Sequence, residues 1–213
     1  MTSLTSFAEE KSQLVRQLES GKQQALVTYG TSLTANGAWV SHLEAALEAN
    51  YPEQCTLINS AGAGKNSQWG LEQLEGRVLK HKPDTVFLEF SINDAVARFD
   101  ISVETAQANL ETMIDRILEI NPDCEVILMT MTPGNKYSEG HRSYRKNVEA
   151  HYAMYRSVAK ERELLLIDHY PQWKALQSSD PQLFKQYVPD TIHANEQGYS
   201  EVVTPVILEA LGI

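Results

Sequence analysis

Five short apolar runs are spaced along the chain, and each is nearly continuous in Val, Leu, Ile and Phe. Such runs are typical of parallel strands that are covered on both faces, because a strand with one solvated face alternates between apolar and polar residues instead. We therefore expect strands at residues 25–29, 55–59, 85–90, 125–130 and 164–168.

Longer segments with a helical period separate these runs. In one of them, an apolar stripe with the spacing of a single helix face is formed by Ala106, Leu110, Met113, Ile114 and Ile117. Further helices are predicted at residues 38–49, 71–80, 148–162 and 195–211. The alternation of strand and helix predicts a doubly wound α/β sheet. Because no linker or repeat interrupts it, we expect residues 1–213 to form one domain.

Two segments break this rhythm. Residues 132–147 are polar and contain glycine, and residues 170–189 carry three prolines and several aromatic side chains. In open α/β sheets, ligands bind beyond the carboxyl ends of the strands, and functional residues concentrate on loops there. We expect both segments to wall a binding pocket.

The composition is that of a globular protein with a marked acidic excess. Hydrophobic residues make up 42% and charged residues 22%, and the formal net charge is −10. That charge repels phosphate backbones and anionic membranes, so we expect neither nucleic acid nor membrane as a partner. The first twenty residues predict a short amphipathic helix without the features of a signal peptide. We expect a cytoplasmic protein, unless a leader has been removed.

Cysteine and histidine patterns give no indication of a metal. The two cysteines, Cys55 and Cys124, are too few for a disulfide framework or a zinc site with cysteine ligands, and we expect buried, reduced thiols. No HExxH motif, Cys/His cluster or carboxylate cage occurs.

Candidate chemistry lies in four polar segments, each placed just after an apolar, strand-like run. In the first, Ser32 comes directly after the first predicted strand. A strand-to-helix turn at this point exposes the serine hydroxyl and leaves its backbone N–H free for an anion. The alternative is that Ser32 caps the following helix, which is common for serine in such turns.

The second segment, residues 59–67, is rich in glycine. It does not match a phosphate-binding loop, because Asn59 and Asn66 stand where that motif needs glycine and Ser or Thr, and Ser67 replaces the third glycine of a dinucleotide fingerprint. A tight turn with a free backbone N–H is the remaining functional role. In the third segment, the amide of Asn93 is a candidate donor to an oxyanion.

The fourth segment holds Asp190 and His193. Their spacing of three residues predicts that one helical turn places both side chains on one face, where the carboxylate orients the imidazole as a base. A rival pair is Asp168 and His169, but adjacent residues at the end of a strand point to opposite faces. We therefore do not expect that pair to form a dyad.

With these residues identified, the chain resembles the SGNH or GDSL-type hydrolases, which are esterases and lipases named for four separate sequence blocks. Ser32 matches the nucleophile of that family, Gly64 and Asn93 match its oxyanion donors, and Asp190 and His193 match its Asp-x-x-His block. The resemblance implies a flavodoxin-like three-layer α/β/α sandwich with a five-stranded parallel sheet. The N–H of Ser32 completes the oxyanion hole that the resemblance implies.

The chain departs from the family pattern at three positions. Thr31 stands where the family usually has aspartate, and Ser91 and Ala61 stand where glycine is frequent. None of these changes removes a group with a catalytic role in the family, so the departures indicate a divergent subfamily. The Gly-x-Ser-x-Gly motif of the larger α/β-hydrolase fold is absent around Ser32.

The resemblance implies hydrolysis of an ester through an acyl-enzyme, without a cofactor. We predict a short-chain acyl ester, such as an O-acetyl group on a carbohydrate or similar polar compound, because the polar segment offers few aliphatic groups. The predicted substrate-binding residues are Phe99, Tyr137 and Arg142, with Lys136 and Tyr144 in the same environment. Two alternatives remain, namely a lipase, lysophospholipase or thioesterase of the same family, and a non-catalytic carbohydrate-binding or scaffold protein.

Overall fold

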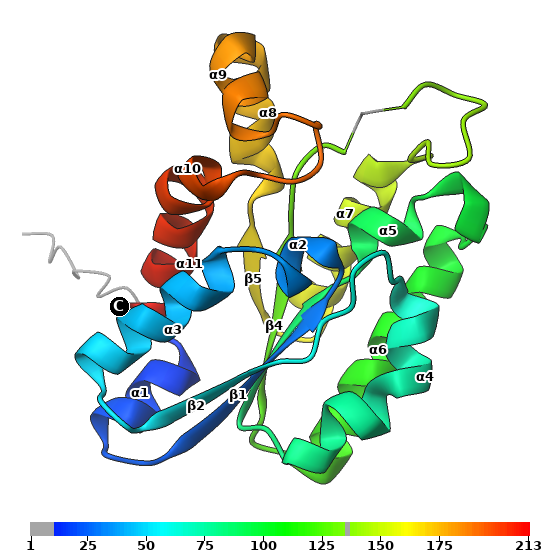
Figure 1. The fold of residues 1–213 in the computed structure, drawn as a ribbon. Helices are drawn as coiled ribbons and strands as arrows, with labels where there is room; N and C mark the ends of the chain where they lie inside the picture. The colour runs from blue at the N-terminus through cyan, green and yellow to red at the C-terminus, as the bar shows by residue number, and fades with distance from the viewer. Residues whose placement is uncertain (1–10, 135–136) are drawn as a thin grey trace, which may run out of the picture.

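A parallel sheet of five strands runs through the centre of the structure, with helices on both of its faces (Figure 1). This computed structural model describes residues 11–134 and 137–213. The strands are β1 (Gln24–Gly30), β2 (Cys55–Asn59), β3 (Thr85–Glu89), β4 (Glu125–Thr130) and β5 (Leu165–Asp168), in the order β2-β1-β3-β4-β5. The predicted five-stranded parallel sheet is confirmed, and every predicted strand lies within one residue of its observed bounds.

The helices fill the intervals between the strands. They are α1 (Gln13–Glu19), α2 (Ser32–Ala35), α3 (Trp39–Asn50), α4 (Ser67–Arg77), α5 (Ser91–Asp94), α6 (Val103–Ile120), α7 (Val148–Glu161), α8 (Tyr170–Ser179), α9 (Pro181–Tyr187), α10 (Glu196–Gly198) and α11 (Thr204–Leu211), with 3₁₀ turns η1 (Leu79–His81) and η2 (Ala97–Phe99) and a π-helical turn η3 (Tyr199–Val203). The predicted final helix thus contains a π-helical turn. Helix α4 begins earlier than expected because the Asn66 side chain caps it by accepting the Trp69 N–H at 3.0 Å.

The continuous apolar runs bury side chains on both faces of the sheet. On one face, Leu26, Phe87 and Ile127 pack with residues of α1, α3 and α11. On the other face, Val27 and Leu88 pack with residues of α4, α6 and α7. These two cores are why the strands do not alternate between apolar and polar positions.

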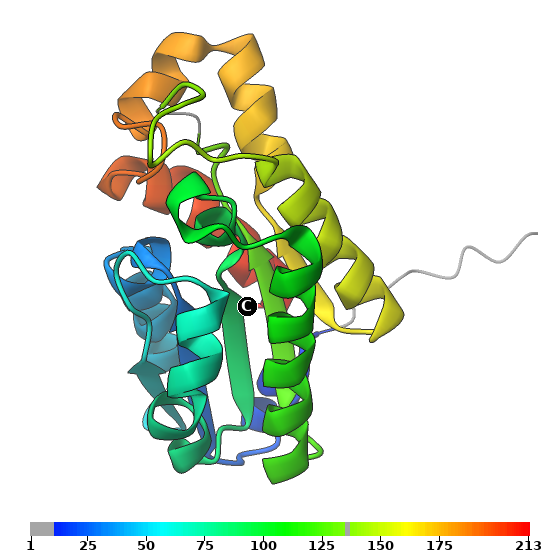
Figure 2. The same ribbon diagram turned by 90° about the vertical axis from the view of Figure 1, so that its right-hand side faces the viewer.

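The segment 170–189 is helical. Prolines lie in the first turn of both α8 and α9, where a missing backbone N–H costs nothing. Asp180 caps α9 by accepting the Leu183 N–H at 3.0 Å. Both views place α8 and α9 beyond the carboxyl ends of the strands (Figures 1 and 2).

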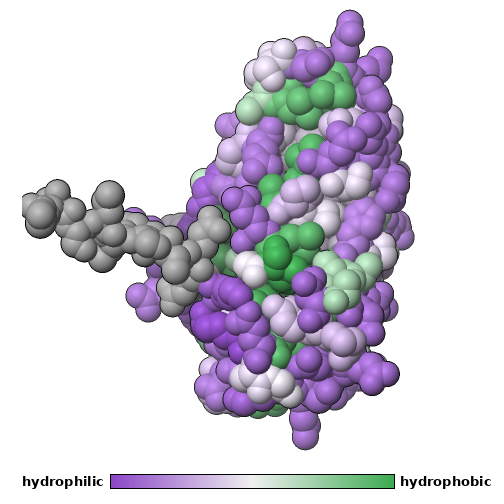
Figure 3. Space-filling model, turned by 90° about the vertical axis from the view of Figure 1, so that its left-hand side faces the viewer, coloured by the Kyte–Doolittle hydropathy of each residue, from purple (hydrophilic) through white to green (hydrophobic). Residues whose placement is uncertain are grey.

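The surface is mostly hydrophilic, and the two cysteines form no disulfide. The face at the left of Figure 1 is mostly hydrophilic, with hydrophobic residues in small separate areas (Figure 3). Within the described residues, Ile120 is the one large hydrophobic side chain that is exposed. Both cysteines are free thiols, with Cys124 buried and Cys55 half-buried. Across the described ranges, no helix combines the length and apolar character required to cross a membrane.

The strand order places a topological switch point between β1 and β3 at the carboxyl edge of the sheet. The chain leaves β1 toward β2 on one side and later returns to β3 on the other side. The turns that follow β1 and β3 therefore diverge, and such a switch point is where doubly wound sheets bind ligands. Ser32 follows β1 and Asn93 follows β3, so both lie at this point.

Candidate active site

The turn after β1 presents the hydroxyl of Ser32 to a histidine. Thr31, and not Ser32, caps α2: its Oγ1 accepts the Leu33 N–H at 3.2 Å. The alternative interpretation of Ser32 as the helix cap is therefore wrong. With the cap supplied by its neighbour, the Ser32 Oγ lies 2.9 Å from His193 Nε2.

The buried side chain of Glu89 anchors this turn to the end of β3 through hydrogen bonds. Glu89, the last residue of β3, is 1% exposed, and its Oε2 accepts hydrogen bonds from the Thr31 N–H at 3.1 Å, the Thr31 hydroxyl at 2.8 Å and the Thr34 hydroxyl at 3.0 Å. Gly30 allows this close approach, since a Cβ there would lie 2.5 Å from the Glu89 carbonyl oxygen. Sequence reasoning did not single out Glu89, although a carboxylate at the end of an otherwise apolar strand is a usable signal.

Burial raises the pKa of Glu89 to about 7, although the hydrogen bonds from Thr31 and Thr34 oppose the shift. Since the ordinary value is 4.5, the folded protein binds a proton at Glu89 between about pH 4.5 and 7 that the unfolded chain does not bind. Protonation of Glu89 therefore stabilises the folded state. This contribution to the free energy of unfolding is fully present below pH 4.5 and is lost as the pH rises to 7.

We expect Glu89→Gln, which resembles the protonated acid, to reduce the loss of stability between pH 4.5 and 7.5 by about 3 kcal/mol. Burial also raises the pKa of Asp94 to about 7, so part of the pH dependence will remain. The measurement is urea unfolding across this range, with Glu119→Gln at an exposed position as the matched control. Equal pH profiles for wild type and Glu89→Gln would contradict the assignment.

Asp190 and His193 meet through a tight turn. Asp190 Oδ2 lies 2.8 Å from His193 Nδ1, and its Oδ1 accepts the N–H groups of Ile192 at 2.9 Å and His193 at 2.7 Å. Residues 190–193 are not helical, so the predicted helical turn is wrong. An aspartate that bonds to the backbone two and three residues ahead brings the side chains together instead, and Thr191 adopts a left-handed φ of 65° to allow it.

This arrangement keeps Asp190 ionised. Burial by itself raises the pKa of Asp190, but the hydrogen bonds from the His193 ring and from the backbone N–H groups outweigh it, so the pKa lies below its ordinary value. An ionised Asp190 accepts the proton on His193 Nδ1, and Nε2 is then left to accept the Ser32 hydroxyl. Ser32, His193 and Asp190 thus form one hydrogen-bonded chain.

The rival pair does not form a dyad, as predicted. Asp168 pairs with Arg156 at 2.7 Å and accepts the Thr130 hydroxyl at 2.5 Å. His169 is fully buried, and within the described residues neither of its ring nitrogens has a hydrogen-bond partner. Burial lowers the pKa of His169 to about 4, so it is neutral at physiological pH.

Hydrogen bonds join the second and third polar segments to the serine turn. The Gly62 N–H donates to the Gly30 carbonyl at 2.9 Å, and the Asn93 Nδ2 donates to the Lys65 carbonyl at 2.8 Å. Between these anchors, Gly64 has a φ of 72°, a conformation in which a side chain is strained. The three loops that carry the predicted residues are therefore held in one network.

Free N–H donors remain on the three joined loops that carry Ser32, Gly64 and Asn93. No acceptor in the described part of the chain takes the backbone N–H of Ser32 or of Gly64. Asn93 uses one of the two hydrogens on Nδ2 for Lys65, so the second is available. Preorganised N–H donors of this kind stabilise a developing oxyanion.

A cavity of about 540 Å³ lies under the polar segment after β4. Its walls include three tyrosines and two charged side chains, contributed by Tyr137, Tyr144, Arg145, Glu149 and Tyr170. The Tyr170 hydroxyl donates to Glu149 at 2.5 Å. The walls thus combine aromatic faces with polar groups, as expected for this segment.

The predicted substrate-binding residues separate in the structure. Tyr137 lines the cavity, whereas Phe99 and Arg142 do not. The ring of Phe99 lies under the guanidinium of Arg98 at 4.6 Å, and Arg142 is exposed. Lys136 lies outside the described residues. Across residues 11–134 and 137–213, no group of three or more His, Cys, Asp or Glu side chains is arranged to hold a metal ion.

Comparison with known proteins gives a consistent class. The model of the GDSL-like lipase/acylhydrolase family matches residues 27–200. An arylesterase of Vibrio mimicus is 25% identical over 169 residues, which cover 72% of this chain and 78% of that protein. Thioesterase 1/protease 1/lysophospholipase L1 of Escherichia coli K12 is 25% identical over 151 residues, covering 68% of this chain and 66% of that protein.

The fold comparison agrees. An acetylxylan esterase from Geobacillus stearothermophilus superimposes with a TM-score of 0.74 at 18% identity, over 90% of this chain and 95% of that one. The chain therefore belongs to the GDSL-like lipase/acylhydrolase family, and the prediction of a carboxylic ester hydrolase is confirmed.

Proposed function

We propose that this protein is a serine esterase in which Ser32 is the nucleophile, His193 the general base and Asp190 the residue that orients it. The observation that carries the proposal is the chain of hydrogen bonds from Ser32 Oγ to His193 Nε2 at 2.9 Å and from His193 Nδ1 to Asp190 at 2.8 Å. A nucleophile bonded to a base that is itself held by a third group is the arrangement that activates a hydroxyl.

The reaction proceeds in two halves. His193 Nε2 takes the proton of Ser32 as Oγ attacks the ester carbonyl carbon, and it then returns that proton to the departing alcohol. Water enters, loses a proton to His193, and attacks the acyl carbon so that Ser32 is released with the free acid. In each half-reaction, the oxyanion accepts hydrogen bonds from the backbone N–H groups of Ser32 and Gly64 and from the side-chain amide of Asn93. Each donor stabilises the oxyanion by roughly 3 kcal/mol.

We further propose that the substrate is a short-chain acyl ester of a polar compound such as an acetylated carbohydrate. The His193 side chain is 46% exposed, so the reacting groups lie in an open site and not at the end of an apolar tunnel. The cavity lined by the segment after β4 offers tyrosine faces for a sugar ring and the carboxylate of Glu149 for hydroxyls. A carbohydrate ester is also the substrate named for the acetylxylan esterase that shares the fold.

The relatives suggest a specific alternative, since the matched protein of Escherichia coli is named as a thioesterase and lysophospholipase. Such substrates carry long acyl chains, and each buried CH₂ contributes about 0.8 kcal/mol, or nearly fourfold in affinity. An enzyme with an acyl groove will therefore show kcat/KM rising steeply from acetyl to octanoyl esters.

We expect the opposite order for this protein. In a series of 4-nitrophenyl esters, acetyl will give the highest kcat/KM, and activity will fall beyond about four carbons because the described cavity is walled largely by tyrosines and charged side chains. Release of acetate from fully acetylated xylose will accompany this preference, with the Ser32→Ala variant as the blank. A preference for octanoyl or longer esters would place the protein with the lipases or thioesterases of its family.

A further inference from the structure

Arg145 makes two hydrogen bonds behind the third polar segment. Its Nε donates to the Ile92 carbonyl at 3.0 Å and its Nη2 donates to Asn93 Oδ1 at 3.2 Å. The Arg145 side chain is partly buried. Among the described residues, it forms no ion pair with a carboxylate. Partial burial of a cation costs free energy when no carboxylate pairs with it directly, so this placement needs a compensating role.

Two independent features of the backbone direct Arg145 to this position. The segment that carries it pairs antiparallel with the residues after α5: the Ala97 N–H donates to the Tyr144 carbonyl and the Lys146 N–H to the Ala95 carbonyl, both at 2.8 Å. In addition, Gly134 leaves room for the arginine stem, since a Cβ at that position would lie 2.7 Å from Arg145 Cδ. The long segment after β4 is thus attached to the loop of Asn93.

The contacts of Asn93 define the direction of its amide. Oδ1 accepts from the guanidinium, and Nδ2 donates one hydrogen to the Lys65 carbonyl. The flipped amide would set its N–H₂ group against the guanidinium donors and its oxygen against the Lys65 oxygen, so both contacts favour one orientation. In that orientation the second hydrogen of Nδ2 is free.

We propose that Arg145 is a positioning residue of the oxyanion hole, which holds the Asn93 amide in its donating orientation and polarises it. This inference rests on the proposed role of Asn93 in ester hydrolysis. A cation bonded to an amide oxygen withdraws electron density from the amide, and hydrogen bonds in such a chain strengthen one another. The benefit is larger for the oxyanion than for the neutral ester, so it lowers the barrier more than it improves binding.

The test is a double-mutant cycle with 4-nitrophenyl acetate. Arg145→Ala will lower kcat by roughly 10- to 100-fold with KM changed by less than about threefold, because an oriented donor is lost and no substrate contact is removed. The kcat of Arg145→Lys will lie between those of wild type and Arg145→Ala, because an ammonium group lacks the forked geometry with which the guanidinium reaches both acceptors. In an Asn93→Ala background, Arg145→Ala will have almost no further effect, because its action passes through the missing amide.

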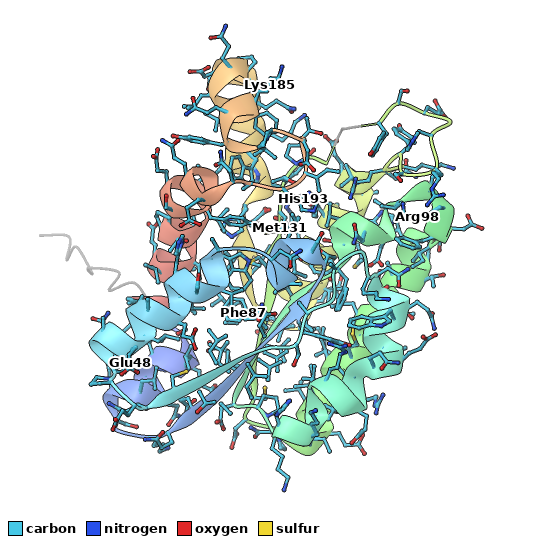
Figure 4. All side chains as sticks on the ribbon, in the orientation of Figure 1. Glu48, Phe87, Arg98, Met131, Lys185 and His193 are labelled. Carbon is cyan, nitrogen blue, oxygen red and sulfur yellow. The ribbon has the colours of Figure 1, made fainter. Side chains whose placement is uncertain are left out.

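Arg98→Ala is the matched control. Arg98 lies on η2 and donates to the Ser143 hydroxyl at 2.7 Å, so its loss disturbs the same pair of loops without touching Asn93. Figure 4 shows Arg98 well away from His193. This variant will keep kcat within about twofold of wild type, and millimolar guanidinium chloride will partly restore kcat to Arg145→Ala but not to the double variant.

Several results would overturn the inference. These are additive effects of the two substitutions, a rise in KM alone, an Asn93→Ala variant with normal kcat, or a control that is as damaged as Arg145→Ala. If Arg145→Ala does not fold, as judged by circular dichroism, the same cycle with Arg145→Lys decides the matter. Failure of the proposed function itself is recognised separately, because wild type would then neither hydrolyse esters nor react with a fluorophosphonate at Ser32.

Discussion

Ser32→Ala is expected to lower kcat for 4-nitrophenyl acetate by roughly 10⁴-fold or more, with the fold unchanged. The substitution removes one hydroxyl, whose hydrogen-bond partner in the structure is His193. The cap of α2 stays in place because Thr31 supplies it. Without the hydroxyl no acyl-enzyme forms, and the remaining donors alone support a small residual rate.

Two measurements make this result specific. Mass spectrometry after treatment with a fluorophosphonate will show one adduct on wild type, located at Ser32, and none on the variant. Ser41→Ala is the matched control, because the hydroxyl of this exposed serine donates to the Ala38 carbonyl in its own helix turn. A Ser32→Ala enzyme with a rate near that of wild type would remove Ser32 from the mechanism.

His193→Ala is expected to be as severe as Ser32→Ala, and the double variant no worse than either alone, because the two groups act as one unit. Asp190→Asn will lose less, roughly 10²- to 10³-fold in kcat, since the carboxylate orients and stabilises the imidazole without exchanging protons itself. Steady-state kinetics of the four variants, all measured at the same pH, provides the measurement.

Asp168→Asn is the control for this comparison. Its carboxylate pairs with Arg156 and not with a histidine, so its loss will reduce stability and leave kcat within a few-fold of wild type. If Asp168→Asn were more damaging to kcat than Asp190→Asn, the choice of acid and imidazole pair would be wrong.

The departure at Thr31 has a structural explanation. Its hydroxyl accepts the Leu33 N–H and also donates to the buried Glu89. One side chain thus begins α2 and attaches the serine turn to the end of β3. An aspartate at this position would set a second carboxyl group beside Glu89, where two negative charges would repel each other in a buried site.

Local patterns in the sequence were enough to predict the fold and to select the candidate residues. Strands that are covered on both faces must be apolar along their whole length, and the intervening helices must carry an apolar stripe, so the five strands and the main helices were readable from local pattern. The serine, glycine, asparagine and Asp-x-x-His segments follow strands or loops that meet at one edge of a parallel sheet, so their proximity was also predictable.

The partners of each polar group, in contrast, depend on how distant parts of the chain pack together. Local spacing indicated a helical turn for Asp190 and His193, but competition from backbone hydrogen bonds to the aspartate favours a tight turn. Phe99 and Arg142 have the right chemistry for a sugar, yet neither lines the cavity, and the pairing of two loops brings Arg145 to Asn93. The pairing of Glu89 with Thr31 joins residues 58 positions apart, and such contacts depend on how the strands pack and leave no periodic signal in the sequence.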